Sequence, residues 1–224
     1  MLLTLPPTGP TLTPGKLLCI GRNYAEHVRE MGDVKDLPTE PVVFLKPSTA
    51  LVASGGEIVI PPQSEDVHHE VEIVAVIGRG GKDIDEAKAL EHVGAYAVGL
   101  DMTARDIQRK AKEARAPWSV AKGFDTFAPL GPLTRAEDVP DPQTLSLQLT
   151  VNGEVRQAGH ARDMIFPLPF VIAYLSRIFT LEPGDLIFTG TPEGVGPVHP
   201  GDELVATAET DDGVALEPLR VTVR

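Results

Sequence analysis

Two glutamates, Glu70 and Glu72, lie two positions apart in the largely apolar segment at residues 68–77. In a β-strand, residues i and i+2 point to the same face, so the two carboxylates would lie side by side. Such a pair repels and loses hydration among apolar neighbours, and it therefore needs a shared proton or a cation. A third carboxylate, Asp101, ends a later apolar segment. Three carboxylates without a cysteine indicate a hard cation with oxygen ligands, Mg²⁺ or Mn²⁺, rather than zinc.

The same spacing has a second interpretation, in which Glu70 and Glu72 lie on a solvated strand face and Asp101 is a surface cap. Glu-x-Glu is a common pattern, so spacing alone leaves both interpretations open. His68 would share the face of the two glutamates, which also allows a His-x-Glu-x-Glu metal site. A supporting or structural role is more typical of His68 and His69 at such positions.

His27 and Glu30 lie three positions apart in a predicted short helix at residues 23–31, so they share one helix face. A carboxylate beside an imidazole orients the ring and raises its basicity, which suits a general base that acts on water. Exposed His/Glu pairs without a function are also common, and the pair alone does not decide between the two.

Further donors lie in two other segments. Arg105 and Gln108 share a face of a predicted helix at residues 103–114, and their donors could hold a carboxylate. Lys122 is isolated in the sequence, and an isolated lysine is usually solvated. The Gly-rich segment at residues 188–196 lacks the Gly-Lys-Ser/Thr ending of a phosphate-binding P-loop, but its backbone N–H groups could bind a small anion.

Short strands and helices must position these residues. Thr103 with Asp106 three positions later approximates a helix capping box. Asn152-Gly153 after an alternating apolar segment indicates a β-hairpin. Strands are predicted at residues 17–20, 41–45, 57–60, 68–77, 95–100, 145–151, 185–189, 203–208 and 214–223, and helices at 23–31, 84–92, 103–114 and 170–179.

Composition limits the class of protein. The chain has 224 residues, of which 42% are hydrophobic, and 21 Gly and 21 Pro, which shorten helices and favour strands. We therefore expect a mainly β fold with short helices, in the α+β class. The net charge of −12 argues against binding to nucleic acids and to anionic membranes. Cys19 is the only cysteine, so no intrachain disulfide can form, and its apolar neighbours predict a buried residue.

The N-terminal residues 1–15 are predicted to be an irregular lead-in, and residues 16–224 a single domain. Prolines interrupt the first 14 residues, which carry no Lys or Arg, unlike a signal or transit peptide. No apolar stretch approaches the roughly 18 residues of a membrane span. A cytoplasmic protein is the expectation.

Six segments together resemble the fumarylacetoacetate hydrolase family, in particular its short acylpyruvase and oxaloacetate decarboxylase-like branch. They occur in the family's order and extend from about residue 17 to about residue 208. The matching segments are residues 21–28, 44–48, 69–72, 101–106, 122–125 and 190–196.

The resemblance implies a rolled mixed β-sandwich, a homodimer, and one Mg²⁺ or Mn²⁺ per subunit. The matching metal ligands are Glu70, Glu72 and Asp101. The resemblance also implies that His27 and Glu30 form a hydrolytic dyad on a lid, and that Lys122 is an active-site lysine. Positions that match the family's substrate site are Arg22, Arg105, Gln108 and Thr191. The lid at residues 32–40 departs from the family pattern, so the exact substrate stays open.

The expected activity is metal-dependent hydrolysis of a C–C bond in acylpyruvate-type 1,3-diketo acids. An acylpyruvate or fumarylpyruvate would give pyruvate and a carboxylic acid, and oxaloacetate would be decarboxylated. The main alternative is an isomerase or decarboxylase of 2-oxo-dienedioates of the 2-hydroxyhepta-2,4-diene-1,7-dioate type, from aromatic catabolism. Two further alternatives are a Schiff-base mechanism at Lys122 and a non-catalytic module that binds a metal or a 2-oxo acid.

Overall fold

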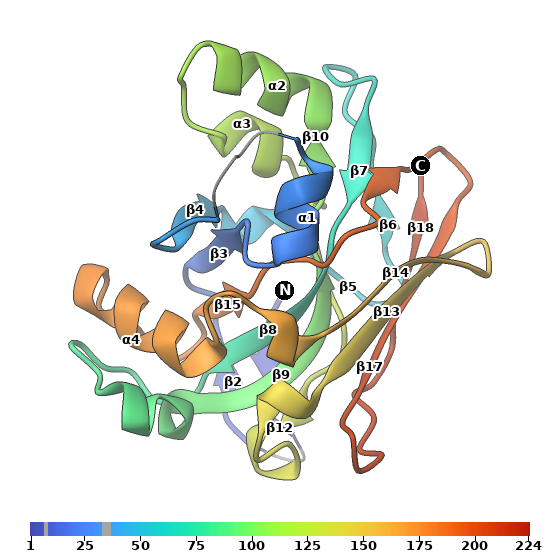
Figure 1. Cartoon of the computed structure of the whole chain (residues 1–224). Helices are drawn as coiled ribbons and strands as arrows, with labels where there is room; N and C mark the ends of the chain where they lie inside the picture. Colours follow the sequence, from blue (N-terminus) through green and yellow to red (C-terminus); the bar gives the residue numbers. More distant parts are fainter. Residues whose placement is uncertain (7–8, 33–36) are drawn as a thin grey trace.

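The structure is a computed structural model that describes residues 1–6, 9–32 and 37–224 (Figure 1). Strands make up most of its regular secondary structure. The largest sheet has eight strands and is strongly curled. In spatial order it contains β4 (Val42–Lys46), β3 (Leu17–Gly21), β15 (Leu186–Phe188), β8 (Val71–Ile77), β9 (Val93–Leu100), β11 (Ala128–Leu130) and β5 (Leu51–Ala53), with β12 (Thr134–Arg135) also paired to β9.

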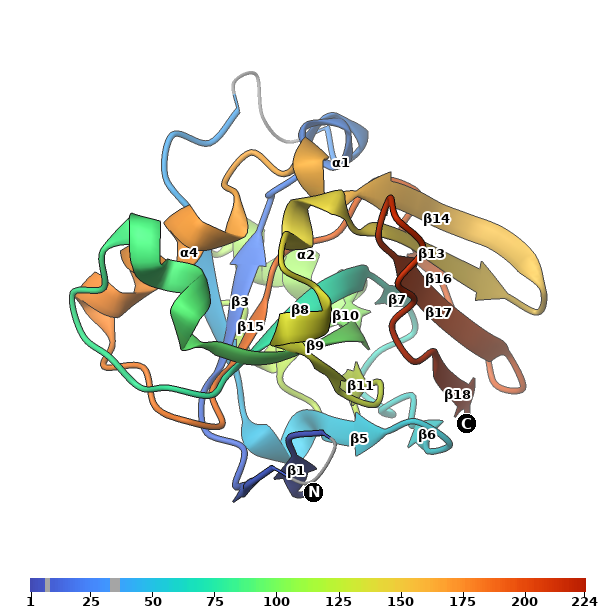
Figure 2. The same ribbon diagram turned by 90° about the horizontal axis from the view of Figure 1, so that it is seen from below.

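A five-stranded sheet lies beside the curled sheet (Figure 2). Leu147 and Leu149 of its strand β13 share a hydrophobic core with Ile73 of β8 and Val98 of β9. This packing of two sheets, with few short helices, confirms the predicted mainly β, α+β fold of the rolled-sandwich type. The strands in order are β14 (Glu154–His160), β13 (Ser146–Val151), β17 (Glu203–Glu209), β18 (Leu219–Val223) and β6 (Glu57–Ile58).

Strand β8 is buried along its whole length because both of its faces are covered. Ile73 and Ala75 enter the core shared with the five-stranded sheet, whereas Val74 and Val76 enter a second core that also contains Cys19. Covered faces explain why this segment is apolar without alternation. The predicted burial of Cys19 is confirmed.

Two small sheets complete the strands. One contains β10 (Thr103–Ala104), β7 (Val67–His69) and β16 (Gly196–Pro197), and the other pairs β1 (Leu3–Thr4) with β2 (Thr11–Leu12). The second pair lies within residues 1–15, which we expected to be irregular throughout. The division of the chain at residue 16 stays a prediction.

The helices are short. In α4 the buried residues Leu168, Val171, Ile172 and Leu175 follow the spacing of one helix face. Helices α1, α2 and α3 each contribute side chains to one cavity. The α-helices are α1 (Ala25–Glu30), α2 (Arg105–Glu113), α3 (Ser119–Lys122) and α4 (Leu168–Ile178), and the 3₁₀ helices are Ser48–Ala50, Glu86–His92, Ala136–Asp138, Pro142–Thr144 and Ala161–Asp163.

The predicted strand at residues 68–77 is wrong in one respect, because it breaks at Glu70. Strand β7 before the break pairs with β10 and β16, whereas β8 after it pairs with β15 and β9. The chain changes sheets at this residue, so Glu70 lies at the junction of the two. A period-2 pattern carries no signal for such a change of partner.

The predicted capping box is also wrong. Thr103 belongs to β10, and its hydroxyl donates to Glu70 Oε1 at 3.1 Å instead of capping α2. The helix expected at residues 84–92 is the 3₁₀ helix Glu86–His92, in which Asp85 accepts from the N–H of Ala87. Tertiary contacts outweigh local capping preference in the first case.

The hairpin predicted at Asn152-Gly153 is confirmed. Val151 pairs with Glu154, so the loop has two residues, with φ angles of 52° and 81°. Positive φ at both positions is the geometry of a type I′ turn, which Asn-Gly favours.

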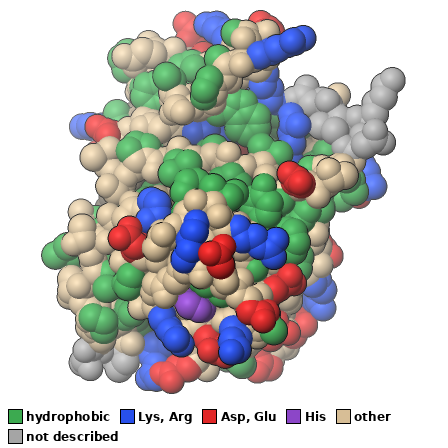
Figure 3. Space-filling view, turned by 90° about the vertical axis from the view of Figure 1, so that its left-hand side faces the viewer, with side chains coloured by type: hydrophobic (Ala, Val, Ile, Leu, Met, Phe, Trp, Pro, Cys, Tyr) green, Lys and Arg blue, Asp and Glu red, His purple; other side chains and the backbone are tan. Residues whose placement is uncertain are grey.

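Hydrophobic side chains gather in the middle of the face shown in Figure 3, the side of the molecule on which β4 lies in Figure 1. Leu45 of β4 and Val120 of α3 are exposed. A groove on this side is lined by residues 42–45 and 116–119. Within the part of the chain that the structure describes, no helix is long and apolar enough to span a membrane.

Candidate active site

The antiparallel pairing of β8 with β9 brings the three predicted carboxylates together. Glu72 lies opposite Gly99 in the ladder, so the start of β8 meets the end of β9, where Asp101 follows. The N–H of Asp101 donates to the carbonyl of Glu70 at 2.8 Å and closes this corner. One oxygen from each of the three carboxylates lies within 4.8 Å of the others, and all three side chains are buried. The solvated-face interpretation is therefore wrong.

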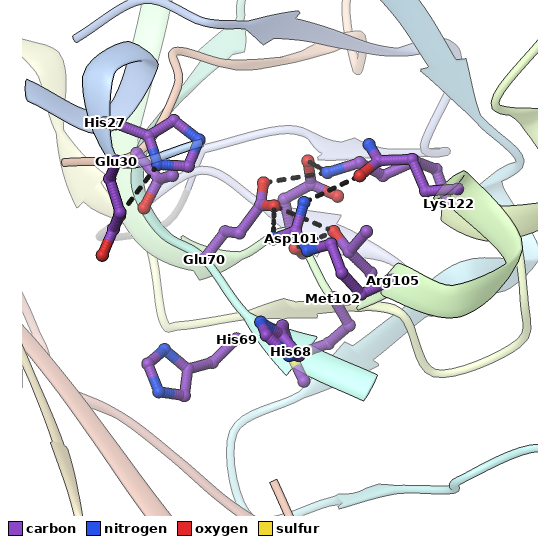
Figure 4. Close-up of polar contacts among 12 residues, drawn as sticks. His27, Glu30, His68, His69, Glu70, Asp101, Met102, Arg105 and Lys122 are labelled. Carbon is purple, nitrogen blue, oxygen red and sulfur yellow. Dashed lines mark hydrogen bonds and ion pairs between the residues drawn. The ribbon is translucent and has the colours of Figure 1, made fainter. Parts of the chain in front are cut away.

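Basic side chains surround two of these carboxylates (Figure 4). Lys122 Nζ lies 2.8 Å from Glu70 Oε2 and 2.6 Å from Asp101 Oδ2. Arg105 Nη2 donates to Glu70 Oε1 at 2.5 Å. Lys46 Nζ lies 2.7 Å from Asp101 Oδ1. Glu70 and Asp101 therefore each have two cationic neighbours.

Glu72 has a different environment. Its Oε2 accepts a hydrogen bond of 2.8 Å from the backbone N–H of Gly190. Burial, together with the charges of Asp101 and Glu70, raises the pKa of Glu72 well above its usual value. Burial also opposes ionisation of Glu70, but Lys122 and Arg105 outweigh it and hold the pKa of Glu70 well below its usual value. A cation placed among the three carboxylates would relieve the repulsion at Glu72.

Lys46, for which the sequence predicted no role, is buried beside Asp101. The ammonium of Lys46 donates to the carbonyls of Met102, Lys122 and Phe127 at 3.0, 2.5 and 2.7 Å. Asp101 Oδ1 lies 2.7 Å from the same ammonium and forms an ion pair with it. Among the described residues, no donor meets hydrogen-bond geometry at this buried oxygen. The carboxylate set therefore fits a hard divalent cation.

His27 and Glu30 lie on α1, on the other side of Glu70 from Lys122 (Figure 4). His27 Nδ1 is 3.5 Å from Glu30 Oε2. Both oxygens of Glu30 accept from the N–H of Gly194, at 3.1 and 3.2 Å, so Glu30 connects the histidine to the Gly-rich segment. Burial lowers the pKa of His27, although Glu70 and Glu30 oppose this shift. A neutral imidazole beside a carboxylate is suited to accept a proton.

A narrow cavity joins these groups. Arg105 and Gln108 line it and are linked by a hydrogen bond of 2.8 Å from Arg105 Nη1 to Gln108 Oε1. The centre of a water molecule can reach about 30 Å³ of this space, so a larger ligand must displace lining side chains. All the predicted site residues except Glu30 and Asp101 line this cavity, namely Arg22, His27, Glu70, Glu72, Arg105, Gln108, Lys122 and Thr191.

The rim of the cavity contains an aromatic side chain that the sequence analysis did not single out. Trp118 has the guanidinium of Arg22 at 5.9 Å and the ammonium of Lys112 at 6.0 Å from its ring centroid. These are cation–π distances. Arg22 has φ of 60°, a left-handed conformation that is uncommon outside glycine. Trp118 is the single Trp of the sequence, and this was the available signal.

The two neighbouring histidines do not join the carboxylates. His68 Nε2 lies 2.8 Å from Asp66 Oδ1, and His69 Nδ1 lies 2.9 Å from Gln157 Oε1. Both have the structural role that the sequence analysis favoured. Residues 33–36 of the predicted lid lie outside the described residues, so the lid stays a prediction.

A family model described as "Fumarylacetoacetate (FAA) hydrolase C-terminal" matches residues 16–224 of the chain. The chain belongs to the fumarylacetoacetate hydrolase family. It is therefore an enzyme of a family whose members include hydrolases and isomerases, and the resemblance seen in the sequence is confirmed.

Members of the fumarylacetoacetate hydrolase family with different activities are similar to this chain. The mitochondrial oxaloacetate tautomerase FAHD1 of Arabidopsis thaliana is 50% identical over 191 residues, which cover 85% of each chain. A fumarylpyruvate hydrolase of Pseudomonas aeruginosa, crystallised with Mn²⁺ and pyruvate, has 43% identity and a TM-score of 0.91 over 100% of this chain and 95% of its own. A 2-hydroxyhepta-2,4-diene-1,7-dioate isomerase of Mycobacterium marinum has 37% identity and a TM-score of 0.81 over 94% and 74%.

Proposed function

We propose that this protein hydrolyses acylpyruvate-type 1,3-diketo acids, such as fumarylpyruvate, to pyruvate and a carboxylic acid, with Mg²⁺ or Mn²⁺ as cofactor. The observation that carries the proposal is that His27, which is paired with Glu30, lines the same cavity as Glu70 and Glu72 of the buried carboxylate cluster. Binding of a metal or a 2-oxo acid alone needs no general base. The Mn²⁺ and pyruvate in the P. aeruginosa relative support the same ligand classes here.

The residues that would hold the divalent cation are Glu70, Glu72 and Asp101. When bound, the cation supplies Lewis-acid stabilisation to the oxygens of the 2-oxo-carboxylate group. Arg105 and Lys122 stay beside Glu70 and keep this carboxylate ionised, as the lowered pKa of Glu70 shows. At Glu72 the contact is a hydrogen bond from the N–H of Gly190, and the pKa of Glu72 is raised, so Glu72 gains most from the cation.

In the proposed reaction, His27 removes a proton from water. Because Nδ1 faces Glu30, Nε2 is the ring nitrogen assigned to accept that proton. The water oxygen attacks the distal carbonyl carbon, and the bond from this carbon to the methylene carbon breaks. The electron pair remains on the pyruvate fragment as an enolate, which takes a proton from His27 to give pyruvate.

Basic groups at the cavity would bind the anionic substrate. Arg105, Gln108 and the hydroxyl of Thr191 present donors to its carboxylate end. Lys122 is buried between Glu70 and Asp101 and offsets negative charge as the enolate forms. Burial opposes the charge of Lys122, but Asp101 and Glu70 outweigh burial and raise the pKa of its ammonium. A protonated amine is not nucleophilic, so Lys122 is not assigned a Schiff-base role.

A second candidate function is tautomerisation of oxaloacetate, which the 50% identical A. thaliana relative favours. Moving a proton between carbon and oxygen of a 2-oxo acid uses the same base and the same enolate stabilisation, but no attacking water. Decarboxylation of oxaloacetate would share these features. Isomerisation of a 2-oxo-dienedioate is the alternative that the M. marinum relative supports.

A turnover panel with Mg²⁺ tests the proposal. It compares acetylpyruvate, fumarylpyruvate, enol-oxaloacetate and a 2-oxo-dienedioate, with the release of pyruvate as one readout and the ultraviolet absorbance of the enol as the other. Hydrolysis predicts pyruvate and an equimolar carboxylic acid. Enol decay without pyruvate would instead assign the tautomerase. The homodimer and the cytoplasmic location stay predictions from the sequence.

A further inference from the structure

Gln157 is a buried residue of the five-stranded sheet, and its side-chain amide forms hydrogen bonds with residues outside that sheet. It lies in β14 with 1% of its surface exposed, and its neighbours Arg156 and Ala158 are exposed. Its side chain reaches the junction between β7 and β8 and the Gly-rich segment at residues 190–196. The first segment carries Glu70 and Glu72 and the second carries Thr191, so one amide connects two parts of the site.

The orientation of the Gln157 amide is determined by two backbone groups. The N–H of Val71 can only donate, and it lies 3.0 Å from Gln157 Oε1. The carbonyl of Pro192 can only accept, and it lies 2.9 Å from Gln157 Nε2. A flipped amide would place its NH₂ group against the N–H of Val71 and its oxygen against the carbonyl of Pro192, so the flipped orientation is excluded.

This orientation dictates the direction of the other two hydrogen bonds. Since Oε1 only accepts, His69 Nδ1 must donate across their 2.9 Å contact. Since Nε2 only donates, Thr191 Oγ1 must accept across 2.8 Å. Thr191 then keeps its own hydroxyl proton, and Thr191 lines the cavity. A hydroxyl held in this way presents its proton as a donor to a ligand oxygen.

We propose that Gln157 is a positioning residue that makes Thr191 a hydrogen-bond donor toward the 2-oxo acid. The proposal rests on the proposed function for the identity of the ligand. Gln157 does not line the cavity, but through Thr191 it would favour ligands that place an oxygen acceptor beside the Thr191 hydroxyl. All four hydrogen bonds of the amide are used, so Gln157 has no capacity left for a ligand of its own.

Gln157→Glu tests this assignment because it keeps the shape but replaces the donor with an acceptor. In this variant the Thr191 hydroxyl donates to the introduced carboxylate and no longer toward the ligand. Gln157→Met, of similar length, removes the orienting donor without adding a charge. Gln148→Glu, at an exposed position of the adjacent strand β13, is the control for the added charge.

The measurement is a double-mutant cycle on oxalate binding in the presence of Mg²⁺, by calorimetry, with Tm recorded for each variant. We expect Gln157→Glu and Thr191→Val each to weaken oxalate binding by about tenfold, the size of one lost hydrogen bond. In the Thr191→Val background, Gln157→Glu should have no further effect. Gln157→Met should show a smaller loss that also vanishes in that background, and Gln148→Glu should bind as the wild type does.

The proposal is overturned if Gln157→Glu weakens binding equally with and without the Thr191 hydroxyl. It is also overturned if Thr191→Val, or both Gln157 variants, leave the affinity unchanged. If Gln157 had a purely structural role, its substitution would lower Tm and weaken oxalate binding whether or not Thr191 has its hydroxyl. The double-mutant cycle therefore distinguishes the two roles. Oxalate binding requires no turnover, so a protein that binds oxalate but converts no 2-oxo acid refutes the proposed function and not the role of Gln157.

Discussion

At the residue scale, the buried charges are arranged unevenly around the three carboxylates. Glu70 and Asp101 are each contacted by two cationic side chains, whereas Glu72 contacts a backbone N–H. Lys122 and Arg105 thus hold Glu70 as an anion, whereas Glu72, whose pKa is raised, depends on an added cation. The same cavity holds a histidine whose lowered pKa keeps it neutral near pH 7. The carboxylates are therefore suited to bind a cation, and the histidine is suited to transfer a proton.

His27→Gln should abolish hydrolysis and spare metal binding. Loss of a positioned general base lowers the rate by about 100-fold or more. The measurement is kcat for fumarylpyruvate or acetylpyruvate, beside Mn²⁺ affinity. Glu26→Gln, an exposed neighbour on α1 that pairs with Arg29, is the matched control and should retain full activity. A His27→Gln protein that hydrolyses normally would remove His27 from the mechanism.

Glu30→Gln should move the acid limb of the pH–rate profile to lower pH. Burial lowers the pKa of His27, and the charge of Glu30 and its polar contact partly oppose this shift. Without Glu30 the pKa of His27 falls further, so the base stays neutral to a lower pH. The maximal rate should fall as well, because the ring loses its orienting partner.

The check is the profile of kcat/KM across the acidic and neutral range for wild type and Glu30→Gln. Glu26→Gln serves again as the control, with an unshifted limb. A limb that moves to higher pH in Glu30→Gln would show that another group controls it.

At the element scale, two segments without regular structure complete the site. The break at Glu70 turns the chain from the small sheet into β8, and the Gly-rich segment supplies N–H donors to Glu72 and Glu30. The donors are Gly190 and Gly194, with φ of 98° and 90°. Positive φ directs these N–H groups toward the carboxylates, at a cost that glycine avoids.

Gly194→Ala should reduce activity, whereas an alanine at another glycine with positive φ should not. A Cβ at this position would lie 2.2 Å from the carbonyl oxygen of Arg156, so the segment must move away from β14 and from Glu30. Gly201→Ala is a matched control, because its φ is 95° and a Cβ would meet nothing within 4 Å.

Both glycine variants should lose about 1 kcal/mol of unfolding free energy for a left-handed alanine. Only Gly194→Ala should lose further stability and also kcat, as measured by denaturant unfolding and steady-state kinetics. Equal activity in the two variants would contradict a role for the Gly194 contact with Glu30.

At the scale of the whole molecule, an acidic protein encloses a cavity in which basic side chains gather around the carboxylates. The net charge is −12, yet cationic side chains gather at and beside the cavity. A local field of this kind can attract an anionic 2-oxo acid against the overall charge. These residues are Arg22, Lys46, Arg105, Lys112 and Lys122.

Divalent cations should stabilise the whole fold, because the three carboxylates join the end of β9 to the start of β8. A ligand at about 100 times its Kd adds about 2.7 kcal/mol to the unfolding free energy. For a chain of this size, Tm should rise by about 5–10 °C with Mg²⁺ or Mn²⁺, and EDTA should reverse the rise.

Glu72→Gln should remove this metal-dependent rise while leaving the metal-free protein at least as stable as the wild type. The variant removes a like charge from a buried cluster, so repulsion with Asp101 and Glu70 falls. Differential scanning calorimetry with and without Mg²⁺ measures both effects. Glu203→Gln, at an exposed position of β17, should keep the full rise. A Glu72→Gln protein with an unchanged rise would place the cation elsewhere.

Local sequence was sufficient where neighbours along the chain interact directly. The i, i+2 spacing placed Glu70 and Glu72 together, the i, i+3 spacing paired His27 with Glu30, and Asn152-Gly153 predicted its turn. Each of these follows from backbone geometry over a few residues. Asp101 was grouped with the glutamates by residue type, as a third carboxylate at the end of a later apolar segment. The family segments supported this grouping and added the role of Lys122, which no local pattern could connect to the glutamates.

Only the tertiary structure decided what surrounds these residues. Lys46 supports Asp101 from the edge strand β4, and Gln157 reaches Thr191 and Val71 from a different sheet. Their partners are distant in sequence, and the sequence around a Lys or Gln does not indicate whether its side chain is buried or solvated. The break at Glu70 and the role of Thr103 were likewise settled by strand pairing. Burial and long-range hydrogen bonding arise only when the sheets pack, because that packing removes the water that would otherwise solvate these groups.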